Sequence, residues 1–273
     1  MSFIKTPLQK AEAAIAQADA VLIGAGAGLS TAAGINYSGP DFEKAFADMI
    51  AHYGFTDLYT SSFYPFKSEE EKWAYWSRHI DYARFTPEGK PLYKHLLEMI
   101  QGKEYFVITT NVDGQFAKAG FDPDKVFEVQ GDYGLMQCAT ACHPKRYSNE
   151  SLVKQMVAQQ KDCRIPSALV PRCPVCGGPM EINVRKDRYF VEDDRWHLQA
   201  DRYYSFLEKS LGKRKLVLLE YGVGYNTPTI IRFPFERMAA SYPDVTLIRI
   251  NKDYRDCQTP GISHFIGLET LFL

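Results

Sequence analysis

The sequence predicts an α/β fold around a parallel sheet, and three features of the chain predict it. Short apolar runs rich in β-branched residues alternate with stretches of helical spacing. Several of these runs end directly in glycine or in short polar residues. The chain of 273 residues is long enough for one large domain that carries inserted modules. Strands separated by helices pair in parallel, so the ends of these runs are expected along one edge of a single sheet.

The first apolar run, residues 21–23, predicts a buried strand that breaks into a turn of small residues. Gly24 and Gly26 lack a Cβ, so the backbone there can turn sharply and approach a ligand closely. A helix that opens near Ser30 would point its free N–H groups at the same place. The turn therefore predicts a pyrophosphate site, and a turn that binds nothing is the alternative.

Helices and further strands follow along the chain. An Ala-rich helix is expected before the first strand, and a capping box at residues 68–71 opens another. The expected helices cover residues 8–18, a stretch from residue 69 onward, 91–99 and 152–159. The further strands are expected at residues 106–110, 126–129, 216–221 and 245–251.

Glycine and short polar residues stand where these strands end. They are Asn111, Asp113, Gln130, Gly222, Gly224 and Asn251. Open α/β sheets bind their ligands in the crevice outside the carboxyl ends of the strands. Convergence of these ends predicts a dinucleotide site.

An aromatic-rich piece, residues 46–90, interrupts the alternation. Between Tyr53 and Phe85 there are eleven aromatic side chains. For most of them we expect a small satellite core, and an aromatic cleft for a substrate or partner is the alternative.

Two pairs of cysteines predict a metal module. Cys138 and Cys142 have the spacing C-x3-C, and Cys173 and Cys176 form a C-x2-C knuckle followed by two glycines. Four thiolates around Zn²⁺ make a closed, structural site. Cys163 and His143 are close enough in sequence to be alternative ligands, and reduced cysteines without metal are the other interpretation.

The composition excludes several classes of function. The net charge is −1 and the pI is near 6.6, so nothing predicts binding to nucleic acid or to an anionic membrane. No run of 18 apolar residues predicts a membrane span, and residues 1–7 lack the apolar core of a signal peptide. Six cysteines in a chain of this size fit a reducing compartment, so we expect a cytoplasmic protein.

Taken together, these motifs resemble those of the sirtuins. The turn at residues 24–30 is similar to the family's GAGxS turn. Asp41 and Phe42 resemble part of its GIPDFR loop. Residues 110–113 with Ala119-Gly120 resemble its TQNIDxLxxxAG signature, and Gly131 matches the glycine of its His-Gly pair. The four cysteines resemble its zinc module, and residues 222–224 stand where it has Gly-Thr-Ser.

The resemblance implies a Rossmann-like domain with a small inserted zinc-ribbon and helical part, and NAD as a consumed substrate. The implied division is residues 1–45, 91–136 and 184–273 for the NAD-binding domain, 46–90 for the aromatic helical segment, and 137–183 for the zinc module. The implied catalytic residues are Asn111, Asp113 and Gln130. The implied NAD contacts are these three with Gly24, Ala25, Gly26, Leu29, Ser30, Asp41, Phe42, Gly222, Val223, Gly224 and Asn251.

Three departures from the family pattern refine this expectation. The family's catalytic His is Gln130 here, the Arg of its DFR motif is Glu43, and the metal module is longer. These departures resemble the divergent, macrodomain-linked microbial branch of the sirtuins. That branch implies mono-ADP-ribosylation of a protein acceptor such as a lipoyl-carrier protein, with a macrodomain ADP-ribosyl hydrolase as a further partner.

The chemistry of Gln130 leads to the same expectation. Deacylation needs a base that activates a ribose hydroxyl, and loss of such a base costs roughly 10²–10⁴-fold in rate. A glutamine side chain accepts no proton, whereas an acceptor carboxylate is already an anion. We therefore expect an NAD-dependent mono-ADP-ribosyltransferase. The alternatives are a weak NAD-dependent lysine deacylase, a nucleotide-sensing module without turnover, and an NAD glycohydrolase.

Overall fold

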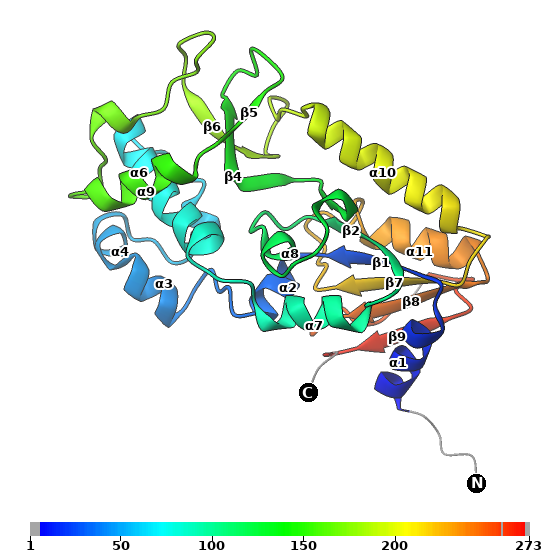
Figure 1. Ribbon diagram of the computed structural model, residues 1–273. Helices are drawn as coiled ribbons and strands as arrows, with labels where there is room; N and C mark the ends of the chain where they lie inside the picture. Colours follow the sequence, from blue (N-terminus) through cyan, green and yellow to red (C-terminus); the bar gives the residue numbers. More distant parts are fainter. Residues whose placement is uncertain (1–5, 258, 271–273) are drawn as a thin grey trace.

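A six-stranded parallel sheet forms the larger part of the molecule in the computed structural model, which describes residues 6–257 and 259–270 (Figure 1). The strand order is β3-β2-β1-β7-β8-β9, so the chain winds outward in both directions from the centre. The strands are β1 (Ala20–Ala25), β2 (Glu104–Thr109), β3 (Val126–Glu128), β7 (Leu216–Tyr221), β8 (Val245–Ile250) and β9 (Phe265–Leu268). The predicted α/β fold with a parallel sheet is confirmed.

Helices cover both faces of this sheet. On one face, α1 (Pro7–Gln17), α7 (Pro91–Met99) and α8 (Gln115–Lys118) pack against the side chains of β1 that include Val21 and Ile23. On the other face, α10 (Asp194–Ser210) and α11 (Arg232–Ser241) pack against the alternate side chains such as Leu22. Both faces of β1 are buried, which explains its unbroken apolar sequence.

Three elements of this domain were not predicted: α10, α11 and β9. Helix α10 buries only four residues along its length, Gln199, Tyr203, Phe206 and Ser210. Such a narrow and partly polar stripe gives a weak periodic signal. The predicted helices at residues 8–18, 91–99 and 152–159 are confirmed as α1, α7 and α9 (Glu150–Gln159).

The smaller part of the molecule combines short helices with an antiparallel sheet in the order β5-β4-β6. Its strands are β4 (Gly131–Cys138), β5 (Arg146–Ser148) and β6 (Met180–Val184). Its helices are α3 (Pro40–Ala45), α4 (Ala47–Tyr53), α5 (Leu58–Ser61), α6 (Glu69–Ile80), the π-helix η1 (Asp81–Phe85), α9 and the 3₁₀ helix η3 (Ser167–Leu169). A further 3₁₀ helix, η2 (Pro123–Lys125), precedes β3.

The aromatic segment and the cysteine module share one hydrophobic core. Trp73 and Tyr75 of α6 pack in the same cluster as Met156 of α9 and Met180 of β6. Strand β4 begins at Gly131, so the boundary expected between residues 136 and 137 falls inside a strand. As predicted, Ser68 caps α6, since its hydroxyl accepts from the N–H of Glu71.

The four cysteine thiols Cys138, Cys142, Cys173 and Cys176 converge, with all sulfur atoms within 4.8 Å of one another. The Cys138 and Cys176 sulfurs are 3.7 Å apart, and those of Cys142 and Cys173 are 3.6 Å apart. A zinc tetrahedron with Zn–S bonds of about 2.3 Å has S–S edges of about 3.8 Å. The arrangement therefore fits the predicted zinc site.

The two alternative metal ligands separate in the structure. His143 lies beside the cluster, where its Nδ1 is 3.1 Å from the sulfur of Cys142 and its Nε2 is 2.8 Å from the hydroxyl of Tyr147. The sulfur of Cys163 instead lies 3.8 Å from a carboxylate oxygen of Asp48. Cys163 therefore belongs to the helical core and not to the cysteine cluster.

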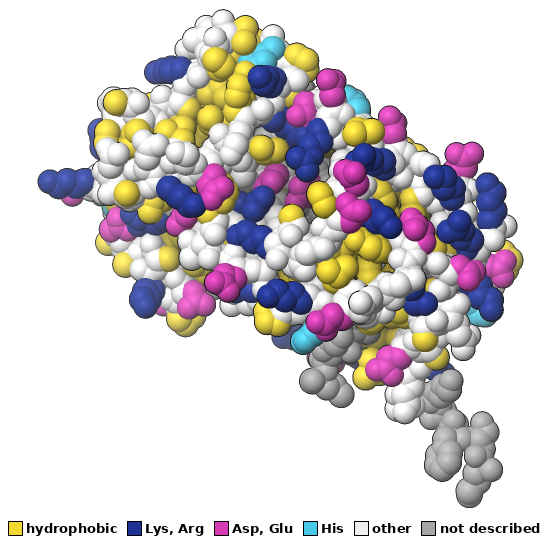
Figure 2. Space-filling view, in the orientation of Figure 1, with side chains coloured by type: hydrophobic (Ala, Val, Ile, Leu, Met, Phe, Trp, Pro, Cys, Tyr) yellow, Lys and Arg dark blue, Asp and Glu magenta, His cyan; other side chains and the backbone are white. Residues whose placement is uncertain are grey.

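The surface carries both signs of charge. Figure 2 shows Lys and Arg side chains interspersed with Asp and Glu across the face that it presents. Within residues 6–257 and 259–270, no helix combines the length and the apolar character that crossing a bilayer requires.

Zinc content tests the cysteine cluster. We expect about one zinc ion per chain by elemental analysis, because four converging thiolates close a structural site. Cys173→Ser should lose that zinc and lower the Tm. The matched variant Cys163→Ser should keep it, since Cys163 contacts Asp48. Zinc-free wild-type protein with an unchanged Tm would contradict the assignment.

Candidate functional site

The turns after β1 and β7 touch through their backbones. The N–H of Gly28 donates to the carbonyl of Gly222 at 2.9 Å, and the N–H of Gly26 donates to that of Tyr221 at 3.0 Å. A Cβ on Gly28 would lie 2.7 Å from the Cα of Gly222. Gly222 itself has φ +65°, which other residues rarely adopt. These glycines bring the two strand ends together at the point where the chain reverses its direction across the sheet.

Several residues of the predicted nucleotide turn serve packing. A Cβ on Gly24 would lie 2.5 Å from a methyl group of Ile231, so this glycine lets α11 approach the sheet. Ala25 and Leu29 are fully buried in the core. The following helix, α2 (Ala27–Ala32), begins at Ala27 and not near Ser30 as predicted.

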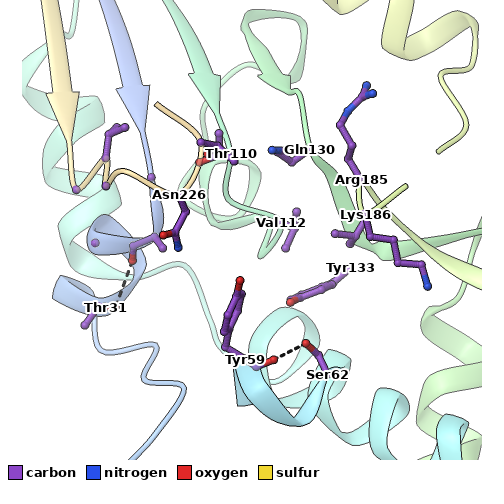
Figure 3. A pocket seen from close by; sticks show the side chains of 18 of the residues that line it. Thr31, Tyr59, Ser62, Thr110, Val112, Gln130, Tyr133, Arg185, Lys186 and Asn226 are labelled. Carbon is purple, nitrogen blue, oxygen red and sulfur yellow. Dashed lines mark hydrogen bonds between the residues drawn. The ribbon is translucent and has the colours of Figure 1, made fainter. Parts of the chain in front are cut away.

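A cavity of about 1250 Å³ opens beside the two glycine turns. One end lies over the carboxyl ends of the parallel strands, where Gly26, Val223, Gly224 and Asn251 line it. The other end lies between α5, α6 and β6 (Figure 3). The cavity therefore spans both parts of the molecule and has room for two reactants.

Asn251 ties the loops at the nucleotide end together. Its Nδ2 donates to the carbonyl of Val223 at 2.9 Å, and its Oδ1 accepts from the N–H groups of Asp253 and Tyr254. Asn251 thus lines the cavity and also holds the loop after β8 against the loop after β7.

Gln130 lies in the wall between the two ends of the cavity (Figure 3). Its backbone carbonyl accepts from the N–H of Arg185 at 2.9 Å, which fixes the backbone next to β6. Its side-chain Oε1 is buried and has no hydrogen-bond partner within the described chain. A buried acceptor without a partner is costly, so the side-chain amide of Gln130 is the group of this wall that gains most from hydrogen bonding to a ligand.

Asn111, Asp113 and Ser30 form a hydrogen-bonded group behind this wall. The Asp113 carboxylate accepts from the hydroxyl of Ser30 and, at 3.0 Å, from the N–H of Gln115. The Nδ2 of Asn111 donates to the hydroxyl of Tyr93 at 3.4 Å. Burial raises the pKa of the Asp113 carboxyl, while the bonds from Ser30 and Gln115 act in the opposite direction.

Two more carboxyl groups and one cation lie next to Asp113. Arg84 forms a bidentate ion pair with Asp132, with Nε and Nη2 at 2.7 and 3.1 Å from the carboxylate oxygens. Burial and the negative charge of Asp132 raise the pKa of Glu128 to about 8.

Within the described chain, no histidine lines the cavity. His79 lies behind Trp76 and Tyr133, which do line it, with its ring stacked on Trp76 at a centroid distance of 5.1 Å. Burial lowers the pKa of His79 to about 3, so its imidazole stays neutral. The carboxylate of Glu181 at the rim is paired with Lys72 and Lys186.

Aromatic side chains line the second end of the cavity. Of the eleven in the aromatic segment, the five that do so are Tyr59, Phe63, Tyr64, Phe66 and Trp76. The other six pack in the core of the smaller part. The aromatic segment therefore forms both the expected satellite core and the alternative, an aromatic cleft. Tyr59 and Tyr133 point toward each other across the cavity (Figure 3).

Asp41 and Phe42 lie away from this cavity wall. Phe42 is buried in the core of the smaller part and stacks on Phe46, with ring centroids 5.3 Å apart. Asp41 is exposed in the first turn of α3. Both residues thus belong to α3 and its packing.

Sequence reasoning missed Tyr133 and the β6 wall. Strand β4 shifts its register against β6 between Asp132 and Met136, and such a bulge re-aims side chains. Tyr133 lies in that bulge, and it lines the cavity together with Ile182 and Val184 of β6. The alternating apolar residues at 180–184 are the signal that could have revealed β6.

Comparisons with known proteins agree with this geometry. The chain is 40% identical over 240 residues to a Staphylococcus aureus protein named protein ADP-ribosyltransferase, covering 88% of this chain and 76% of that protein. It is 32% identical over 246 residues to a probable bifunctional ADP-ribose hydrolase/ADP-ribosyltransferase of Fusarium oxysporum f. sp. cubense, covering 86% of this chain and 41% of that protein.

A solved structure of a Sir2 homologue with NAD has the same fold. It superposes with a TM-score of 0.54 at 18% identity, over 94% of this chain and 86% of that one. Residues 26–200 of the chain match the Sir2 family. From the fold, the matched residues and the 40% identical relative, the chain belongs to the Sir2 family.

Proposed function

We propose that this protein is an NAD-dependent protein mono-ADP-ribosyltransferase, which transfers ADP-ribose from NAD to a protein side chain and releases nicotinamide. The observation that carries the proposal is Gln130, whose side chain lines the cavity at the position where the motif resemblance has the family's histidine. Two relatives with ADP-ribosyltransferase in their names support it.

The transfer needs no base if the acceptor is a carboxylate. The C1′–N bond of NAD breaks, and its electron pair leaves with neutral nicotinamide. A carboxylate oxygen of the acceptor then forms the new bond to C1′. Because no proton is removed from this nucleophile, the absence of a histidine from the described cavity wall does not block the reaction.

Gln130, Asn111 and Asp113 have separate roles in this proposal. The side-chain amide of Gln130 hydrogen-bonds a ribose hydroxyl and so aligns C1′. Asn111 lies between Thr110 and Val112, which line the cavity, and orients the ribose and the nicotinamide through this segment. The Asp113 carboxylate stabilises the positive charge that develops at C1′. The hydroxyl of Ser30 holds that carboxylate in place.

The nucleotide occupies the end of the cavity that the glycine turns form. There Gly26, Gly222, Val223, Gly224 and Asn251 contact NAD. Gly24, Ala25 and Leu29 support this surface from the core. The aromatic end receives the acceptor, for which we propose a lipoyl-carrier protein, and a macrodomain hydrolase removes the product.

Labelling of an acceptor tests the proposed reaction. Incubated with NAD and a lipoylated carrier protein, the wild-type enzyme should release nicotinamide and attach one ADP-ribose mass to the carrier. Gln130→Ala should reduce the labelling rate, because the ribose loses a hydrogen-bonding partner. Efficient deacetylation of an acetyl-lysine peptide, with O-acetyl-ADP-ribose as the product, would contradict the proposal.

Asn111→Ala tests the orienting role. We expect a loss of nicotinamide release of about 100-fold or more, because a misplaced ribose loses its reactive geometry. ADP-ribose binding by calorimetry and the Tm should stay near wild type, since Asn111 contributes one long side-chain hydrogen bond to the fold. Unchanged turnover would remove Asn111 from the site.

A further inference from the structure

Arg84 reaches the candidate site from the smaller part of the molecule. It lies in the π-helix η1, an element that often marks functional positions. The Nζ of Lys118 on α8 donates to the carbonyls of Arg84, Phe85 and Pro87 at the end of this element. Lys118 thus holds the end of η1 against the larger domain.

The guanidinium of Arg84 is fitted closely into its place. A Cβ on Gly114 would lie 2.3 Å from the Arg84 Cζ, and Gly114 has φ +64°. The Arg84 and Asp132 side chains are 18% and 12% exposed, so their bidentate pair is largely shielded from water. The carboxylate of Asp132 also accepts from the N–H of Gly134 at 2.7 Å.

The pair joins the two turns that carry the proposed catalytic residues. Asp132 is two residues after Gln130, and Gly114 directly follows Asp113. The N–H of Tyr133 donates to the carbonyl of Val112 at 3.0 Å, which ties the same two segments together. A shift of Arg84 would therefore move both turns.

Several charged groups surround Arg84. Facing it are Asp132 on β4, Glu128 on β3, Asp113 after β2, Lys118 on α8 and Glu150 on α9. Arg195 on α10 acts on Glu128. The charge of Arg84 lowers the pKa of Asp113, and that of Asp132 raises it.

We propose that the Arg84–Asp132 ion pair is a positioning clamp for this site, which aligns the Gln130 turn with the Asn111–Asp113 turn and places a fixed positive charge beside the Asp113 carboxylate. Arg84 acts through Asp132, Gly114 and Asp113 and is a positioning residue. The clamp rests on the proposed function for its effect on turnover, but its effect on Asp113 is independent of turnover.

Substitutions of the two partners should shift the pH profile in opposite directions. Arg84→Ala removes a cation, so the pKa of Asp113 rises. The acid limb of the pH profile, where nicotinamide release falls as the pH is lowered, then moves to higher pH than in the wild type. Asp132→Asn removes an anion, so the acid limb moves to lower pH. A merely structural pair would not produce opposite shifts.

Turnover and a matched control complete the test. Arg84→Ala should lower kcat about 10- to 100-fold, with a smaller change in the KM for NAD. Arg84→Lys should restore the position of the acid limb but not kcat, because lysine lacks the bidentate geometry. Arg78 of α6 forms a similar ion pair with Asp48 of α4. Arg78→Ala breaks that pair and should keep the wild-type kcat.

Two readouts separate failure of the clamp from failure of the proposed function. If the wild type releases nicotinamide, an Arg84→Ala enzyme with wild-type kcat and acid limb overturns the clamp. If the wild type shows no turnover, the proposed function fails. The titration of the Asp113 carboxyl group by ¹³C NMR, with the signal assigned from Asp113→Asn, then tests the clamp. If Arg84→Ala and Asp132→Asn shift the pKa of Asp113 in the same direction, the clamp is overturned. If Arg84→Ala does not fold, Arg84→Gln takes its place in the comparison with Asp132→Asn, because glutamine also removes the cation.

Discussion

Backbone contact between two glycine turns sets the position of the site. The N–H groups of Gly26 and Gly28 donate to carbonyls at the end of β7, so the carboxyl ends of β1 and β7 lie against each other. The sheet order changes direction between β1 and β7, and a crevice opens there in α/β folds. A side chain at Gly28 or Gly222 would collide with backbone and separate the turns. The N–H groups of Gly26 and Gly28 are hydrogen-bonded to the chain itself. Packed backbone therefore gives the nucleotide end of the cavity its shape.

A buried group of ion pairs supports the other side of this crevice. Arg249 is bidentate to Glu220, with both side chains fully buried, and Arg232 joins them from α11. Arg232 also donates to the carbonyls of Val223 and Tyr254, which belong to the two loops that line the cavity. Charges in a core cost solvation free energy unless every partner is present. This network therefore ties the loops after β7 and β8 to the buried core.

The sequence predicts the elements whose chemistry is local. The strand at β1 and the cap at Ser68 each depend on one short pattern, and the cysteine cluster depends on two short patterns that share one metal chemistry; all three are found in the structure. What it does not predict depends on contacts between distant segments. Arg84 contacts Asp132, which is 48 residues away in the sequence. Tyr133 lines the cavity because of a bulge in β4, and that bulge is defined only by the pairing of β4 with β6. The part of Gly24 in helix packing is hidden for the same reason, since α11 lies far along the chain.

Several titratable groups near Gln130 are engaged in other contacts within the described chain, and this bears on the choice of nucleophile. Burial raises the pKa of Glu128, Asp132 is paired with Arg84, and Glu181 is paired with two lysines. The imidazole of His79 is neutral but lies behind the aromatic wall. An acceptor that must lose a proton before attack gains little from such surroundings, whereas one that arrives as an anion needs only alignment. Selection of the acceptor is then a matter of which charged side chain can pass the aromatic end of the cavity and reach C1′.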